Sequence, residues 1–185
     1  MKKIQKILKG KYLAVGAVVV ILVAVFFSWG YLPVMKVNGE MVSYRTFSKI
    51  LDAMNTYDKA AGKAPLAEAE MKRKVFSDLV EQKFLDETIA KTDPAMEKEA
   101  EALVEQAIKD TPGLNTKDAS RLLFSLSEKD FKHLVLLPQA KRDVVMKRFE
   151  TNPDFPNMWS ELYKNAQVSV YYPGFYWEEG EIKSK

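Results

Sequence analysis

The chain has 185 residues, contains no cysteine and carries a formal net charge of +3. Without cysteine it forms no disulfide, thiolate metal site or thiol nucleophile. The first 11 residues hold five lysines and no acid, which leaves a charge of −2 for residues 12–185 and no basic excess to attract nucleic acid. This lysine-rich tail over residues 1–11 comprises Lys2, Lys3, Lys6, Lys9 and Lys11.

A long apolar run follows the tail. Residues 12–35 are 24 positions without a charge, and a helix that rises about 1.5 Å per residue crosses a hydrocarbon core of about 30 Å over that length. Because lysine-rich flanks stay in the cytoplasm, the sequence predicts a single-pass protein of the cell (inner or cytoplasmic) membrane. Its main domain is then expected on the periplasmic or extracellular face. The residues taken to mark this anchor are Tyr12, Ile21, Phe26, Trp29 and Tyr31.

A cleavable signal peptide is the alternative interpretation of this run. Its apolar stretch is longer than usual, and Ser28-Trp29-Gly30 is a poor cleavage site. A buried core helix is a weaker alternative, since soluble core helices rarely lack a polar stripe.

The segment after the anchor has the pattern of a small hairpin that leads into a helix. Asn38-Gly39 accepts the positive φ angles of a type I′ turn, with Val37 and Val42 as strand residues on either side. Ser43 is a favourable N-cap for a helix whose apolar positions recur every three or four residues. Those positions are Tyr44, Phe47, Leu51 and Met54.

Two longer helices are expected next. The first covers roughly residues 66–91. The second begins at Asp93-Pro94, an acidic N-cap followed by proline, and ends before residues 111–113. Its buried stripe is predicted at Met96, Ala100, Leu103, Ala107 and Ile108.

Shorter elements are expected after residue 114. The pattern predicts helices over 117–126, from a capping box at Ser127, from Pro138 and, after a loop over 150–156, around Trp159. Residues 167–172 alternate as a strand. The end, residues 178–185, is expected to be a charged and frayed tail.

The two ends of the domain are expected to meet. An isolated two-stranded hairpin is marginal in water, so the N-terminal hairpin is predicted to pair with the strand at 167–172. The predicted fold class is therefore mainly α. It consists of an N-terminal transmembrane helix and a helical domain over residues 36–177, closed by a small β-pairing between its ends.

Motifs that carry chemistry are missing from the sequence. His133 is the single histidine, and there is no HExxH, GxSxG or phosphate-binding glycine loop. We expect no enzymatic activity, no cofactor, no metal ion and no nucleic-acid partner. An enzyme, the remaining alternative, would need a concave polar cluster around His133 or buried acids.

The methionine and aromatic residues have several interpretations. Met54, Met71, Met96 and Met146 at helical spacing favour core packing, and an adaptable surface for apolar segments of other chains is the alternative. The C-terminal aromatic residues have three interpretations: they pack under the helices of the domain, they contact a client or partner, or they lie on the membrane interface. The candidate client contacts are Met54, Tyr57, Phe131, Tyr171, Tyr172, Phe175, Tyr176 and Trp177.

An ordered series of motifs follows the anchor. Residues 37–47, VNGEMVSYRTF, resemble the opening of the chaperone domain in SurA-like, PpiD-like and PrsA-like proteins, and residues 75–85 resemble its second helix. Residues 127–131 and 159–170 are similar to later segments of that family. The resemblance spans nearly all of 36–172. It implies a helical domain of the SurA N-terminal type that binds unfolded chains.

The chain departs from that family in one respect. Phe149 reaches Trp159 across the 150–156 loop, which leaves no room for a parvulin domain, and the paired histidines of a parvulin site are missing. The resemblance therefore implies a chaperone without prolyl isomerase activity.

Together these features predict a membrane-anchored, extracytoplasmic, chaperone-like holdase. Its expected partners are unfolded or newly translocated polypeptides and, through the anchor, the lipid bilayer; the oligomeric state is left open. The alternative is a scaffold or assembly subunit with one dedicated envelope partner. Binding of many unrelated clients favours the holdase, and a single saturable partner favours the scaffold.

Overall fold

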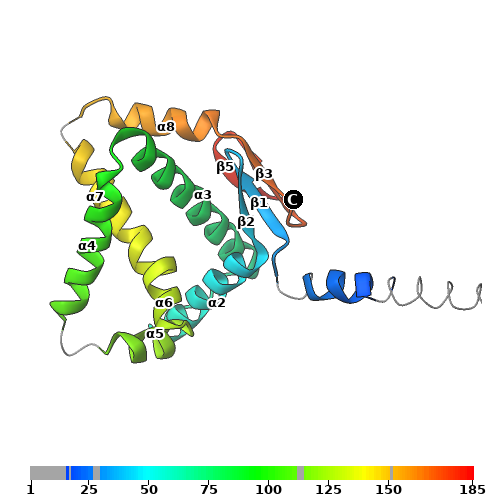
Figure 1. Ribbon diagram of the computed structural model, residues 1–185. Helices are drawn as coiled ribbons and strands as arrows, with labels where there is room; N and C mark the ends of the chain where they lie inside the picture. The colour runs from blue at the N-terminus through cyan, green and yellow to red at the C-terminus, as the bar shows by residue number, and fades with distance from the viewer. Residues whose placement is uncertain (1–15, 17, 27–29, 112–114, 151) are drawn as a thin grey trace, which may run out of the picture.

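The computed structural model describes residues 16, 18–26, 30–111, 115–150 and 152–185 (Figure 1). This part of the chain is mainly helical with two small sheets, so the predicted fold class is confirmed at that level. The strands are β1 (Pro33–Val37), β2 (Glu40–Ser43), β3 (Val168–Val170), β4 (Phe175–Glu178) and β5 (Glu181–Ser184). The helices are α2 (Tyr44–Ala60), α3 (Glu68–Thr92), α4 (Ala95–Lys109), α5 (Thr116–Phe124), α6 (Glu128–Phe131), the π-helix η1 (Lys132–Leu136), α7 (Leu137–Phe149) and α8 (Phe155–Asn165).

The predicted anchor lies only partly within the described residues. Residues 18–26 form an exposed apolar helix that leads into the domain at the start of β1 (Figure 1). Within the described ranges, no helix combines the length and the apolar character that a membrane crossing requires. The five lysines of the tail, Tyr12 and Trp29 lie outside the described residues. The transmembrane part of the predicted fold therefore stays a prediction.

The first sheet joins the two ends of the domain, as predicted. Its strand order is β2-β1-β3, and β3 pairs antiparallel with β1, Val170 opposite Met35 and Val168 opposite Val37. The hairpin turn has φ angles of 46° at Asn38 and 94° at Gly39, the left-handed region that a type I′ turn requires. Both the hairpin and its pairing with the late strand are confirmed.

The last residues of the chain are a correction to the sequence prediction. Residues 178–185 do not fray: β5 pairs with β4 in a second hairpin, and Ile182 is only 3% exposed. The turn passes through Glu179 and Gly180, whose φ angles are 52° and 86°. The hairpin packs onto the core, so the domain continues past residue 177.

Helices α2 and α6 begin at their predicted caps, Ser43 and Ser127, whereas α8 begins at Phe155, inside the predicted loop over 150–156. The apolar faces of α2 and α4 also differ from the prediction. The Ser43 hydroxyl accepts the Thr46 N–H at 3.2 Å, which caps α2, whereas Tyr44 is exposed because it lies at the outer end of the sheet. Helix α4 buries Met96, Ala100 and Val104 against α7. These positions are spaced by four residues on a narrow contact face, which leaves Leu103 and Ala107 exposed.

Pro138 does not begin a separate helix. Helices α6, η1 and α7 follow one another without a break from Glu128 to Phe149. Because proline has no N–H and its ring presses on the carbonyl four residues back, an α-helical turn is strained there. The chain widens instead: the Leu137 N–H donates to the Lys132 carbonyl, five residues earlier.

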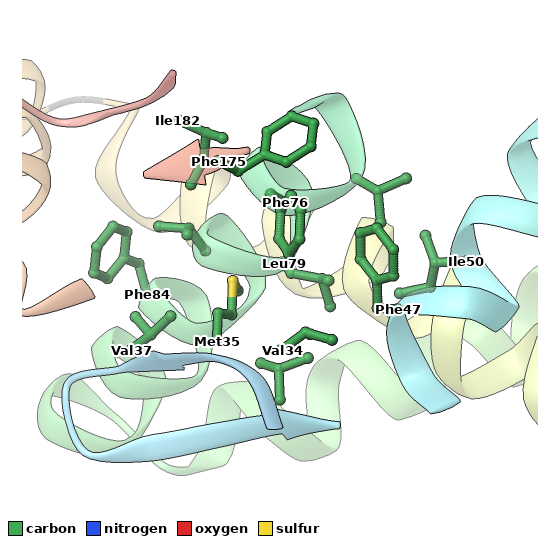
Figure 2. Close-up of a cluster of buried hydrophobic side chains, with 13 residues drawn as sticks. Val34, Met35, Val37, Phe47, Ile50, Phe76, Leu79, Phe84, Phe175 and Ile182 are labelled. Carbon is green, nitrogen blue, oxygen red and sulfur yellow. The ribbon is translucent and has the colours of Figure 1, made fainter. Parts of the chain in front are cut away.

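The buried apolar side chains form three separate clusters. Cluster 1 lies between the sheets, α2 and α3, and its labelled members point toward one another in Figure 2. Cluster 2 lies between the C-terminal half of α3 and helices α4, α7 and α8. Cluster 3 joins Ala53 of α2 to Leu126 and Phe131. Among the described residues the buried core is thus divided into three clusters, of which cluster 1 is the largest, and Trp159 packs against both cluster 1 and cluster 2.

Candidate functional site

A cavity of about 340 Å³ lies where the three clusters meet. Ile50 of cluster 1, Leu85 of cluster 2 and Leu126 of cluster 3 all line it. The three clusters therefore do not merge at this point, and apolar side chains face an open space.

The lining comes from elements far apart in the sequence. Helix α2 supplies Met54, the end of α5 supplies Phe124, and η1 supplies Leu134 and Val135. These side chains are neither fully buried nor fully exposed. The widened turn before Pro138 is a π-helical turn, a feature that is frequent at functional sites. It places two apolar side chains on the wall of the cavity.

One side of the cavity is charged. Arg142 of α7 donates from Nε and Nη2 to the two carboxylate oxygens of Glu81 on α3, at 2.7 and 2.5 Å. Bidentate pairs of this kind are among the most specific ionic contacts, so this pair fixes the spacing between α3 and α7. Burial and the neighbouring Glu81 carboxylate raise the pKa of Tyr163, although Arg142 opposes the shift.

Asp78 lies one helical turn before Glu81 and lines the same cavity. Burial raises the pKa of the Asp78 carboxyl, and the Glu81 charge adds to the effect, while Lys74 and Arg142 oppose it. A half-buried carboxylate beside an apolar wall is costly to ionise. Asp78 therefore reports directly on the polarity of the cavity.

We expect Asp78→Asn to stabilise the domain at neutral pH relative to the wild type. The folded-state pKa lies above the ordinary value of 3.8, so the folded state binds the proton more tightly than the unfolded state. The stabilisation from Asp78 is then fully present below that value and is lost as the pH rises through the folded pKa. Urea titrations between pH 3 and 7 measure the difference between variant and wild type.

Asp52→Asn serves as the control for this prediction, because Asp52 is exposed on the neighbouring helix. It should leave the free energy of unfolding unchanged. An Asp78→Asn variant that tracks the wild type at every pH would show that the cavity wall is as polar as bulk water.

A second hollow of about 320 Å³ adjoins the first, since both are lined by Gln82, Leu85 and Pro138. His133 lies on its rim with Glu101. Across it, Lys141 of α7 donates to Asp86 at 2.7 Å and approaches Glu97 to 2.8 Å. Burial lowers the pKa of Lys141, but the hydrogen bonds that its ammonium group donates to the Asp86 and Glu97 carboxylates outweigh it and raise the pKa overall.

The polar groups of this second hollow do not form an acid–base pair. Asp86 and Glu97 are held by Lys141, and His133 is exposed. In the part of the chain that the structure describes, no hydrogen bond joins His133 to a carboxylate, and no group of side chains is arranged to hold a metal ion. The hollow offers charge pairs that fix α3, α4 and α7.

The predicted client contacts fall into different places, and only one lines the cavity. Met54 does so, whereas Tyr57 stacks outside it on Phe124 with ring centroids 5.1 Å apart. Phe131 is buried in cluster 3. Tyr171 is 52% exposed at the end of the first sheet.

The remaining predicted contacts belong to the core or its edge. Phe175 is buried, and Tyr172 packs between Phe47 and Phe76 with centroid distances of 5.3 and 5.8 Å. Trp177 stacks on Tyr163 at 6.4 Å. Tyr176 is half-buried in a shallow depression beside α3. Most C-terminal aromatic residues therefore pack inside, the first of the three interpretations.

Sequence reasoning missed most of the cavity. Leu126, Leu134 and Val135 fall within the predicted helices over 117–126 and from Ser127, whose apolar pattern does not distinguish a cavity wall from a core position. The proline six residues after Lys132 was the one local signal of an irregular helix. Compared with protein-family models, curated protein sequences and solved structures, the chain gives no significant match.

Proposed function

We propose that the domain is a chaperone-like holdase that receives apolar segments of unfolded polypeptides in the cavity between the three clusters. One observation carries the proposal. Apolar side chains of α2, α5 and η1 line one side of a hollow of about 340 Å³ between the three clusters, and charged side chains of α3 and α7 line another side. That volume suits a few side chains of an extended segment and is too small for a folded element.

Binding in such a cavity needs no cofactor or nucleotide. The side of the wall formed by α2, α5 and η1 is apolar, and Met54 adapts to differently shaped segments because a thioether side chain repacks easily. Burial of each apolar side chain contributes about 25 cal/mol per Å² before the entropic cost of ordering the client. The interaction is therefore weak and reversible for each segment, as a holdase requires.

The apolar helix at residues 18–26 supports the second part of the proposal, a tether to the membrane. Its side chains are exposed, with fractions of 60% at Ile21 and 54% at Phe26. We propose that residues 12–30 anchor the chain in the cell membrane with the domain outside; the predicted end at residue 35 is too late, because Pro33–Val37 form β1 and Met35 is buried in cluster 1. A tether raises the effective concentration of the cavity near emerging chains. Prolyl isomerase activity forms no part of the proposed function.

The test uses residues 30–185, one segment longer than the domain boundary at 36 predicted from sequence. The longer fragment keeps β1 from Pro33 onward and the Gly30 carbonyl, which accepts the Arg45 N–H at 2.9 Å. Circular dichroism first establishes that the fragment is folded. Light scattering then measures whether equimolar fragment suppresses aggregation of several unrelated, chemically unfolded proteins.

We expect the double variant Met54→Gln/Leu134→Gln to lose most of this suppression. Full burial of one such side chain contributes about 1.5–3 kcal/mol, so losing two contacts weakens client binding by about tenfold or more. The matched control is Leu103→Gln/Leu122→Gln, which alters apolar residues of similar size that are exposed outside the cavity.

Three results bear on the proposal. Suppression that the control variant keeps and the cavity variant loses, with both folded, supports it. Suppression lost equally in both variants shows that clients bind general apolar surface rather than the cavity. A folded fragment without suppression overturns the holdase and favours the dedicated-partner scaffold.

A further inference from the structure

Four exposed side chains gather where the chain enters the domain: Tyr31, Leu32, Tyr44 and Tyr171, here called the collar. Their exposed fractions are 48%, 40%, 45% and 52%. None of them belongs to the three core clusters or to the cavity. The collar is thus an apolar surface that the proposed client site does not use.

Backbone hydrogen bonds hold the collar together across three neighbouring segments. The Tyr44 N–H donates to the Leu32 carbonyl at 2.7 Å, and the Tyr171 N–H donates to the Val34 carbonyl at 2.7 Å. The residues after β2, before β1 and after β3 therefore lie side by side at one end of the sheet. The collar is a fixed part of the fold.

The collar is also close to the apolar helix. Four residue steps separate Phe26 from Gly30, which at about 3.8 Å each places their Cα atoms within about 15 Å. The Phe26 and Tyr31 rings stack with centroids 6.1 Å apart. Since the Gly30 carbonyl accepts the Arg45 N–H at 2.9 Å, the start of α2 is tied to the same point. Whatever surrounds the apolar helix therefore lies within reach of the collar.

We propose that the collar lies in the interfacial layer of the lipid bilayer and gives the domain a second attachment beside its anchor. This inference rests on the proposed tether, not on client binding. Tyrosine suits the interface because its ring is apolar and its hydroxyl hydrates. Arg45, exposed beside Tyr44, supplies a cation for lipid phosphate groups.

The same surface fits a partner protein less well. None of its four side chains lines either of the two hollows described above, so the collar gives a partner's side chains neither hollow to fill. A lipid interface is continuous with the surroundings that the proposed tether gives to the apolar helix at residues 18–26. Of the C-terminal aromatic residues, Tyr171 fits the membrane interpretation, because Phe175 is buried, Tyr172 and Trp177 pack against the core, and Tyr176 lies in the depression beside α3.

The experiment uses the full chain in vesicles of phosphatidylethanolamine and phosphatidylglycerol. The chain has no cysteine, so each single-cysteine variant carries one fluorescent label. The test variants are Leu32→Cys and Tyr171→Cys. Leu103→Cys is the matched control, because Leu103 has the same 40% exposed fraction as Leu32 and lies on α4, on the far side of the domain from the apolar helix (Figure 1). Ile21→Cys reports on the anchor.

We expect nitroxide-labelled lipid to quench the labels at positions 32 and 171, and aqueous iodide to quench them much less than the label at 103. Labels at 32 and 171 that behave like the one at 103 overturn the proposal. Labels shielded from both quenchers also overturn it, because they place a protein on the collar.

The label at position 21 separates failure of the collar from failure of the tether. Quenching by lipid at 21 but not at 32 or 171 leaves the anchor standing and removes the collar. If lipid does not quench the label at position 21, both the proposed membrane anchor and the proposed attachment through the collar are overturned. The aggregation assay on residues 30–185 involves no membrane, so its outcome is independent of both.

Discussion

Replacing Phe76 with alanine is expected to lower the free energy of unfolding by about 3–5 kcal/mol. Phe76 is fully buried in cluster 1, with its ring centroid 4.5 Å from Phe47 and 5.4 Å from Phe175 (Figure 2). These contacts join α3 to α2 and to the C-terminal hairpin, so the cavity left by alanine cannot close by moving one element. Urea titration of residues 30–185, followed by circular dichroism, measures the loss.

Leu122→Ala is the control for Phe76→Ala. Leu122 is 65% exposed on α5, and substitutions at such surface positions change stability by no more than about 0.5 kcal/mol. A loss at Phe76 as small as that at Leu122 would contradict the central place of cluster 1. Because domains of this size have total stabilities of about 5–15 kcal/mol, the expected loss approaches complete unfolding at the lower end.

Ile182→Ala is expected to lower the free energy of unfolding by about 2–5 kcal/mol, although only three residues follow Ile182 in the sequence. Its side chain is 3% exposed and packs in cluster 1. The residue lies opposite Trp177 in the β4–β5 register, so the loss also loosens the packing of Trp177 on Tyr163. The same urea titration measures the effect.

The neighbouring variant Glu181→Ala is the matched control, because Glu181 is exposed in the same strand. If residues 178–185 are a frayed tail, as the charge pattern alone predicts, neither variant changes the free energy of unfolding. A structured hairpin makes only Ile182→Ala costly. Equal and negligible losses of stability at positions 181 and 182 would show that residues 178–185 do not pack on the domain.

Local signals predicted the framework of the fold because they act over a few residues. Asn38-Gly39 specifies its turn through backbone conformations that few residues accept. Ser43 and Ser127 cap their helices through side chains that satisfy nearby N–H groups. Pairing between the two ends followed from the instability of a lone hairpin.

The C-terminal hairpin was not predicted because charged residues interrupt the apolar alternation that indicates a strand. Its turn uses Glu179 at positive φ, where asparagine or aspartate is usual. Ile182 is one apolar residue among charged neighbours, so no alternation extends far enough to indicate a strand. The signal that remained was Trp177 and Ile182 flanking a glycine-containing turn.

The cavity was beyond reach of the sequence for a different reason. Leu85, Leu126 and Leu134 carry the same helical spacing whether their clusters merge or stay apart. That outcome depends on the angle between α3 and α7, which the Glu81–Arg142 pair and the widened turn at η1 help to set. Neither feature has a periodic signature in the chain.

The central position of β1 constrains the order in which the chain can fold. One of its neighbours, β3, lies near the end of the domain: Asn38 and Gln167, hydrogen-bonded at the edge of that pairing, are 129 residues apart in sequence. A contact over such a separation forms late, because closing the intervening loop costs entropy before the pairing is gained. When the chain emerges N-terminus first, Met35 and Val37 stay uncovered until nearly the whole domain has followed. During most of its own synthesis, the protein is therefore an incompletely folded chain with exposed apolar residues, the kind of chain that it is proposed to bind.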